Sequence, residues 1–293
     1  MAKKSKKKEG LSSWGLLILG FLVGVAFVMA VFRFGDIDFP KTVPEEKPSA
    51  RYVPPAPEPV PPPPPIEAAP DTSARLAIVI DDMGPDIGRL RQLLALGAPV
   101  TVAVMPHQRF SKETAEEAYV GGLDVLMHLP MEPNDLAAHD PGKGALLVAM
   151  TLPEVRAQIE DDLATIPHAI GINNHMGSRF TENEPLMGEV LDFLRSKDLF
   201  FLDSRTTARS VAIKLATRMG VPNAGRNVFL DNTREVGYIK KQIFEAARLA
   251  GKNGTAIAIG HPYPETIQAL SEALPELAAY GVRAVRLSEI IEQ

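Results

Sequence analysis

The chain of 293 residues contains no cysteine. This absence excludes a disulfide framework, a thiol nucleophile and a cysteine metal site, so any transition metal must be bound by histidine and carboxylate. The dinucleotide fingerprint is also missing, because no G-x-G-x-x-G follows an apolar run and opens a helix. From residue 34 onward, 25 basic side chains stand against 35 acidic ones. This acidic balance argues against nucleic acid as a partner.

The first 73 residues have the composition of a membrane anchor followed by a spacer. Residues 1–10 are rich in lysine, and residues 11–33 are apolar over about the 20 residues that a helix needs to cross a bilayer. Because lysine resists translocation, this pattern predicts a single-pass protein of the inner (cytoplasmic) membrane, with a cytoplasmic basic tail and a periplasmic C-terminal domain. A cleaved signal peptide ending near Ala30 is the alternative. Residues 34–73 are rich in proline, which predicts a disordered linker.

Residues 74–293 alternate short apolar runs with longer amphipathic ones, a pattern typical of strand-helix units around a parallel sheet. The uninterrupted alternation favours a single α/β domain folded as one (β/α) barrel, and a doubly wound open sheet is the main alternative. The longest insertion, 132–151, is predicted to be a loop that shapes a substrate groove. The expected strands are 76–81, 100–104, 124–128, 169–173, 200–203, 228–231, 255–260 and one near 283–285, and the expected helices are 85–96, 111–119, 153–166, 185–197, 212–219, 236–250 and 266–280.

Four of the apolar runs end abruptly in groups that bind or transfer protons. LAIVIDD ends in Asp81 and Asp82, LDVLMH in His128, AIGINNH in His175 and TAIAIGH in His261. A parallel strand covered by helices meets solvent and substrate only at its C-terminal end. We therefore expect these groups to converge on one rim, as a metal or acid-base site.

The adjacent carboxylates of Asp81 and Asp82 can divide two roles, one binding a cation and the other acting as a base. Side chains of neighbouring strand residues diverge, so a bulge or turn must present both. The alternative is structural: Asp82 caps the helix that begins near Pro85, and Asp81 makes a buried hydrogen bond.

His128 and His175 are the natural imidazole ligands, and two histidines plus one carboxylate leave an open position for water, as in hydrolytic zinc sites. His261 follows a different strand and could protonate a leaving group, or could itself be a metal ligand. Asp203 ends another apolar run, where it could orient a histidine or pair with Arg205. His107 is a weaker candidate for the same rim.

Five ordered motifs, IDDMG, MHLPMEP, GINNHMGSRFT, FLDSRTT and IGHPYPET, resemble the divergent polysaccharide deacetylase family, which is similar to the wider carbohydrate esterase group with a deacetylase barrel. The resemblance covers residues 75 to 293. It implies a seven-stranded (β/α) barrel, a divalent metal that is usually zinc, and removal of acetyl groups from amino sugars.

Carried over residue by residue, the resemblance makes Asp81 the base, Asp82 the metal carboxylate, His128 the first metal histidine and His261 the acid. Classical members place a second histidine four residues after the first, where this chain has Glu132. The missing imidazole is therefore assigned to His175, with Glu132 and His261 as alternatives. The usual Arg-Pro-Tyr and Asp-Trp segments are absent.

The sequence thus predicts a membrane-anchored, Zn²⁺-dependent hydrolase that acts on an acetylated envelope polysaccharide or peptidoglycan-type glycan. The first alternative is a glycan-binding or scaffold protein that keeps the barrel without turnover. The second is a glycosidase that uses Asp81 and Asp203 and requires no metal.

Overall fold

The computed structural model describes residues 74–291. The predicted basic tail (1–10), membrane anchor (11–33) and linker (34–73) lie outside this range. Within residues 74–291, no helix has both the length and the hydropathy that crossing a membrane requires.

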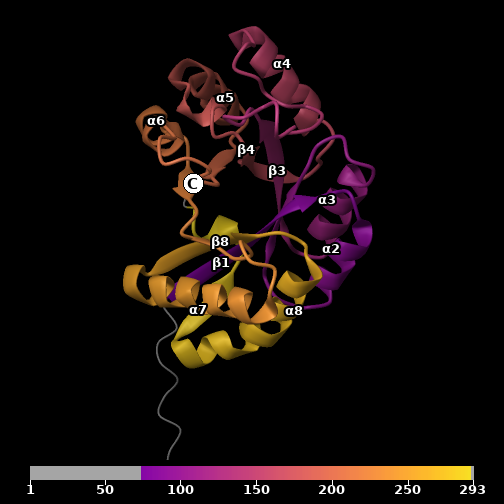
Figure 1. Ribbon diagram of the computed structural model, residues 1–293, viewed down its shortest axis with the longest axis vertical. Coiled ribbons are helices and arrows are strands. Elements are labelled where there is room, and N and C mark those ends of the chain that lie inside the picture. The colour runs from indigo at the N-terminus through magenta and orange to yellow at the C-terminus, as the bar shows by residue number, and fades with distance from the viewer. Residues whose placement is uncertain (1–73, 292–293) are drawn as a thin grey trace, which may run out of the picture. The chain divides into compact units, whose positions relative to one another are not determined.

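All strand pairs in the described part of the chain are parallel, as expected for an α/β fold. The sheet lies inside and the helices surround it (Figure 1). The strands are β1 (Ala74–Met83), β2 (Thr101–Val104), β3 (Asp124–Met131), β4 (Ala169–Met176), β5 (Phe200–Asp203), β6 (Asn223–Gly225), β7 (Val228–Phe229), β8 (Thr255–Gly260) and β9 (Val282–Val285).

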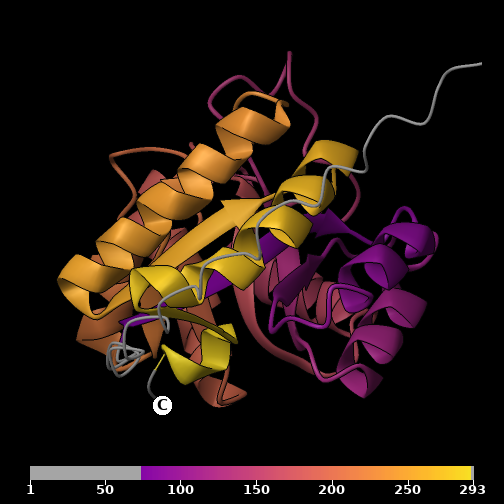
Figure 2. The same ribbon diagram turned by 90° about the horizontal axis from the view of Figure 1, so that it is seen from below.

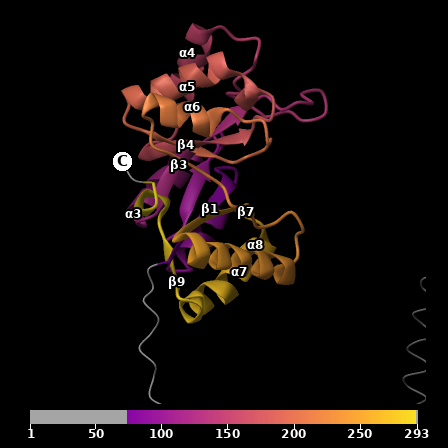
Figure 3. The same cartoon turned by 90° about the vertical axis from the view of Figure 1, so that its left-hand side faces the viewer.

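The helices begin and end close to the residues that the apolar spacing predicts. Helices α4, α5 and α6 gather at one end of the described domain (Figure 3), whereas α7 and α8 lie side by side at the other (Figures 2 and 3). The α-helices are α2 (Ile87–Leu94), α3 (Ser111–Val120), α4 (Leu152–Leu163), α5 (Glu184–Ser196), α6 (Ala212–Met219), α7 (Val236–Asn253) and α8 (Pro264–Ala273), and the 3₁₀ helices are η1 (Phe180–Glu182), η2 (Leu274–Tyr280) and η3 (Leu287–Glu289).

The strand order is β6-β5-β4-β3-β2-β1-β8-β7, with β9 paired to β1. This order runs round the sheet without the reversal that defines a doubly wound fold, so the main alternative is wrong. A flat path of eight strands would be roughly 34 Å wide at about 4.8 Å per strand. The ends of this path, β6 and β7, are separated by only residues 226–227, which span at most about 11 Å between their flanking Cα atoms. The sheet must therefore curl.

The prediction of a seven-stranded (β/α) barrel is confirmed in part. The parallel, curled sheet is present, but it has nine strands, and among residues 74–291 no ladder pairs β6 with β7. The one strand predicted at 228–231 is replaced by two short strands, because the chain changes partner at residues 226–227. The amide of Arg226 donates to the carbonyl of Asp203 on β5 (3.0 Å). The amide of the next residue, Asn227, donates to the carbonyl of Ile257 on β8 (2.8 Å).

The buried apolar side chains form two clusters, as the alternation of side chains along a strand requires. On β1, Leu76, Ile78 and Ile80 belong to the larger cluster, which packs against the helices. Ala77 and Val79 belong to a smaller cluster on the inner face of the curled sheet. The same division recurs on β3, β5 and β8, so the position of a residue in its strand decides which face it meets.

Candidate functional site

Strand alternation carries the predicted site residues onto the inner face. Asp81 continues the inner series of Ala77 and Val79, and His128 continues that of Leu126. His261 follows Ile257 and Ile259 in the same way. On β4, Ile172 faces the helices, so His175 faces inward. The convergence expected from the strand ends is therefore what the structure shows.

A local distortion of β1 presents both aspartates, as the sequence requires. The register between β1 and β2 shifts between Ile80 and Met83, and Asp82 has a φ of 55°, in the left-handed region. Aspartate tolerates this conformation better than most residues. The distortion leaves Asp81 buried, at 3% exposure, and brings the carboxylate of Asp82 to the same side.

Three atoms form a nearly equilateral triangle at the centre of the site. Asp82 Oδ1 lies 3.1 Å from His175 Nδ1 and 3.2 Å from His128 Nε2, and the two imidazole nitrogens are 3.1 Å apart. Asp82 Oδ1 is buried yet has no hydrogen bond of acceptable geometry. Ligands of a tetrahedral zinc ion at about 2.0–2.2 Å lie roughly 3.3–3.6 Å apart. The triangle has almost these dimensions, so the three residues fit a divalent cation.

Asn173, next on the inner face of β4, fixes the tautomer of His128. Its Nδ2 donates to Asp81 Oδ1 at 2.8 Å, which leaves its Oδ1 to accept from His128 Nδ1, also at 2.8 Å. With the proton on Nδ1, the neutral imidazole directs the lone pair of Nε2 at the triangle. Asn173 is fully buried. Asn173 therefore orients His128 from outside the triangle.

The charged groups of the cluster shift each other's pKa values. Burial raises the pKa of Asp81, against the opposing effects of His128 and Asn173. Burial also tends to raise the pKa of Asp82, but the imidazoles of His128 and His175 outweigh it and hold that pKa well below its usual range. Burial lowers the pKa of His128, but the combined effect of the two carboxylates is larger and raises that pKa to about 9. Without a cation, the carboxylates are therefore balanced by a protonated His128.

His261 is held by a residue that the sequence analysis did not single out. Asp231, which follows β7 on the inner face, accepts from the backbone amide of His261 at 2.6 Å, and its Oδ1 lies 3.0 Å from His261 Nδ1. Thr266 donates a further hydrogen bond to Asp231 at 2.8 Å. Burial lowers the pKa of His261, but Asp231 and then Asp82 more than offset it, so the pKa is raised. Nε2 faces the cluster, 3.7 Å from Asp82 Oδ2.

Glu132, one alternative for the third ligand, is not in the triangle. Its Oε2 accepts from the amide of Val148 at 2.6 Å, and its Oε1 pairs with Arg179 at 2.8 Å. The carboxylate therefore fastens the long insertion to the turn after β4. His261, the other alternative, lies beside the triangle with its Nδ1 turned to Asp231.

Asp203 lies on the opposite face of its strand, because Phe200 and Leu202 occupy the inner positions of β5. Its Oδ1 accepts from the amide of Arg205 (2.7 Å) and its Oδ2 from the hydroxyl of Ser210 (2.7 Å). Both oxygens thus stabilise the turn after β5. A glycosidase that uses Asp81 with Asp203 has no support in this arrangement.

His107 is drawn into a separate cluster. Its Nε2 lies 2.8 Å from Asp162 Oδ1 and 3.3 Å from Asp161 Oδ2. Burial, the largest effect, raises the pKa of Asp162 to about 6. This group ties the turn after β2 to α4, away from the residues of the triangle.

Comparisons with known proteins show the fold and the family of the chain. A Haemophilus influenzae protein described as uncharacterized is 38% identical over 204 residues, covering 70% of this chain and 72% of the relative. The uncharacterized protein YibQ of Escherichia coli K12 is 36% identical over 226 residues, which cover 77% of this chain and 70% of the relative. The crystal structure of the uncharacterized protein ATU2773 from Agrobacterium tumefaciens C58 has the same fold, with a TM-score of 0.71 and 24% identity. The match covers 74% of this chain and 89% of that protein. The model of the divergent polysaccharide deacetylase family matches residues 78–291, and the chain therefore belongs to that family.

Proposed function

We propose that this protein is a zinc-dependent hydrolase that removes acetyl groups from the amino sugars of an envelope glycan. The observation that carries the proposal is the triangle of Asp82, His128 and His175, flanked by the buried carboxylate of Asp81 and by a third imidazole, that of His261, which is held independently. Nitrogen and carboxylate ligands with an open side suit zinc better than magnesium, which prefers oxygen ligands and water. A zinc ion in this place would polarise the amide carbonyl and lower the pKa of a water molecule.

Asp81 is placed to accept the proton of the attacking water. Its Oδ2 lies 3.7 Å from His128 Nε2, so the carboxylate is adjacent to the triangle. Burial raises its pKa, which moves the carboxylate toward the range in which a general base is effective near neutral pH. Asn173 holds the carboxylate in position through its other oxygen.

His261 is placed to donate a proton to the departing amine. Its Nδ1 faces Asp231, which leaves Nε2 free to carry the proton toward the cluster. The raised pKa keeps this imidazole protonated to higher pH, as a general acid requires. The amide C–N bond breaks, water supplies the oxygen of the released acetate, and the nitrogen leaves as an amine.

Acetate release from N-acetylglucosamine oligomers by the full-length, zinc-loaded protein tests this proposal. We expect Asp81→Asn to lower kcat by roughly 10²–10⁴-fold at unchanged zinc content. His175→Ala should lose the zinc as well as the activity, and the exposed-loop variant His139→Ala is the control. Acetate release that survives both Asp81→Asn and removal of zinc would refute the proposal.

A glycan-binding protein without turnover is the second candidate. Glu132, at the position of the family's second histidine, is committed to Val148 and Arg179, which motivates this alternative. The two functions separate in the same assay, because a binding protein would retain the oligomers and release no acetate.

We also propose that the folded domain works in the periplasm, anchored in the inner membrane by residues 11–33. The apolar stretch and the lysine-rich residues before it support this placement. Protease added to spheroplasts should digest the domain from outside. Protection until the cells are lysed would contradict the proposed topology.

A further inference from the structure

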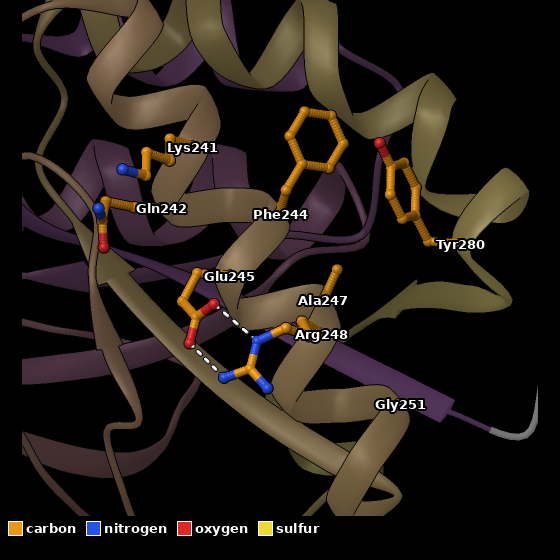
Figure 4. Close-up of a pocket in the computed structure, with 8 residues that line it drawn as sticks. All are labelled: Lys241, Gln242, Phe244, Glu245, Ala247, Arg248, Gly251 and Tyr280. Atoms are coloured by element: carbon orange, nitrogen blue, oxygen red, sulfur yellow. Dashed lines mark hydrogen bonds and ion pairs between the residues drawn. The ribbon is translucent and has the colours of Figure 1, made fainter.

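A groove of about 580 Å³ runs along α7, away from the candidate metal centre (Figure 4). Its lining residues on α7 recur at spacings of three and four from Lys241 to Gly251, so they share one face of the helix over about 15 Å. The opposite wall is Tyr280 at the end of η2, whose ring centre lies 4.9 Å from that of Phe244. Tyr280 is 58% exposed, so more than half of this aromatic side chain is available for contact.

Both walls of the groove lead to the start of β1. The amide of Arg75 donates to the carbonyl of Gly254, directly after α7, at 2.9 Å. On the other side, Ala74 pairs with Val282, two residues after Tyr280. The chain that leads into Ala74 is therefore attached beside the C-terminal end of α7, where the groove begins.

The segment that precedes Ala74 contains a proline and two acidic residues. Residues 66–71, near the end of the predicted linker and outside the described range, have the sequence Ile-Glu-Ala-Ala-Pro-Asp. Proline favours an extended backbone, in which the chain advances about 3.2 Å per residue. At this advance, an extended segment would place Pro70 roughly 13 Å and Glu67 roughly 22 Å from Ala74.

The groove presents complementary groups at nearly the same distances from the point of entry. A helix advances about 1.5 Å per residue, so Phe244 lies about 15 Å and Lys241 about 20 Å from Gly254 along α7. Pro70 would therefore reach the aromatic pair, and aromatic rings are the surfaces on which proline-rich segments commonly dock. Glu67 would reach Lys241, which forms no ion pair within the described part of the chain.

The charges of the groove also suit an acidic segment. Glu245 and Arg248 in its wall pair with each other at 2.8 and 2.6 Å, so their charges cancel (Figure 4). Lys241 then leaves the groove with a net positive charge, whereas the segment 66–71 carries two acidic residues and no basic one. Opposite charges at an exposed surface favour docking at low ionic strength and are screened as salt is added.

We propose that residues 66–71 dock along this groove, with the proline against the two aromatic rings and Glu67 beside Lys241. Docking makes this segment a part of the folded domain, so that the spacer leading to the predicted membrane anchor ends at residue 65. The docking is independent of the proposed hydrolase activity, because the groove includes none of the strand-end groups of the site.

The absence of cysteine from the chain allows a direct test by disulfide cross-linking of the full-length protein. The pair Ala68→Cys and Gln242→Cys joins the segment to the groove without changing any of the groups proposed to hold it. The control pair combines Ala68→Cys with Arg283→Cys, at an exposed position that is the strand partner of Arg75. A segment that does not dock would reach the control position at least as readily, because this position is closer to the start of β1.

We expect the groove pair to cross-link within one chain roughly tenfold faster than the control pair, because docking raises the local concentration of the two thiols. Lys241→Glu and Tyr280→Ala should each slow this reaction about fivefold, as the loss of one exposed ion pair or one aromatic contact would. Adding Glu67→Lys to Lys241→Glu should restore the rate. Tyr119→Ala, which removes an exposed aromatic ring from α3, should have no effect.

Three outcomes would overturn the proposal. Equal rates for the two pairs would show that the segment has no preference for the groove. Cross-links that join two chains into a dimer would identify the segment of a second copy as the occupant. A fast reaction of the groove pair that neither Lys241→Glu nor Tyr280→Ala slows would show that the proposed contacts do not hold the segment.

Discussion

Hydrogen bonds from buried neighbours decide what each residue of the site can do. Asn173 is the clearest case, because a single side chain both holds Asp81 and selects the tautomer of His128. His261 depends in the same way on Asp231.

Replacing Asn173 by alanine should therefore weaken metal binding without removing a ligand. We expect zinc affinity to fall about 10–100-fold, the usual effect of losing a group that orients a metal-binding histidine. Competition with a chelator measures this change. Asn174→Ala is the control, because Asn174 bonds Met176 and Ser204 instead of His128. Equal zinc affinities of the two variants would contradict the role assigned to Asn173.

The raised pKa of His128 predicts how the metal-free protein responds to pH. Its folded pKa of about 9 exceeds the ordinary value of 6.5, so protonation favours the folded state. This contribution is fully present below pH 6.5 and is lost as the pH rises through about 9. Denaturation of the metal-free protein should show this decline between pH 6.5 and 9, and His128→Gln should not. Parallel curves for the two proteins would disprove the assignment.

The ends of the apolar runs predict Asp81, Asp82, His128, His175 and His261, because a polar group that ends an apolar run is visible in the sequence. Asp231 could not be identified in this way. Asp203 and Asp231 both follow short apolar runs, yet one faces the helices and the other the site. The difference depends on strand register and, for Asp231, on its partner His261, which lies 30 residues further along the chain.

At the scale of the elements, sequence spacing predicts most helices to within a few residues, whereas the partner change between β6 and β7 is not predicted. Strands of three and two residues carry no detectable alternation. The distortion of β1 after Ile80 was foreseen only because two adjacent carboxylates require one.

Close packing between β4 and β5 gives a prediction about the sheet. A Cβ on Gly171 would lie 2.5 Å from the ring of Phe200, which is nearly fully buried. We expect Gly171→Ala to lower the free energy of unfolding by about 1–3 kcal/mol, as overpacking usually does. Chemical denaturation measures the loss. Gly237→Ala in α7, where an added Cβ meets nothing within 4 Å, should be neutral or slightly stabilising. Similar stabilities of the two variants would contradict the packing argument.

At the scale of the whole molecule, the candidate metal centre joins segments that are far apart in the chain. Asp82, His128 and His175 come from β1, β3 and β4, so an ion bound to all three favours the folded state over any state in which these strands separate.

Zinc should therefore raise the melting temperature of the full-length protein. At one hundred times the dissociation constant, the expected stabilisation is about 2.7 kcal/mol. Scanning calorimetry with zinc, with magnesium and with added chelator measures the effect, and magnesium should give little because two of the three ligands are imidazoles. His175→Ala should abolish the shift. A zinc-induced shift that persists in this variant would place the ion elsewhere.

The side chain of Arg75 donates to the carbonyl of Glu289 at 2.6 Å, which brings the two boundaries of the described fold together. They adjoin near the start of β1, where Ala74 is separated from Asp82 by roughly 26 Å of extended strand at about 3.3 Å per residue. A fusion partner or surface linkage attached at either boundary is thus remote from the reactive groups. A protein immobilised through these ends would present the candidate site to the surrounding medium. The site would then be accessible to a large polymer.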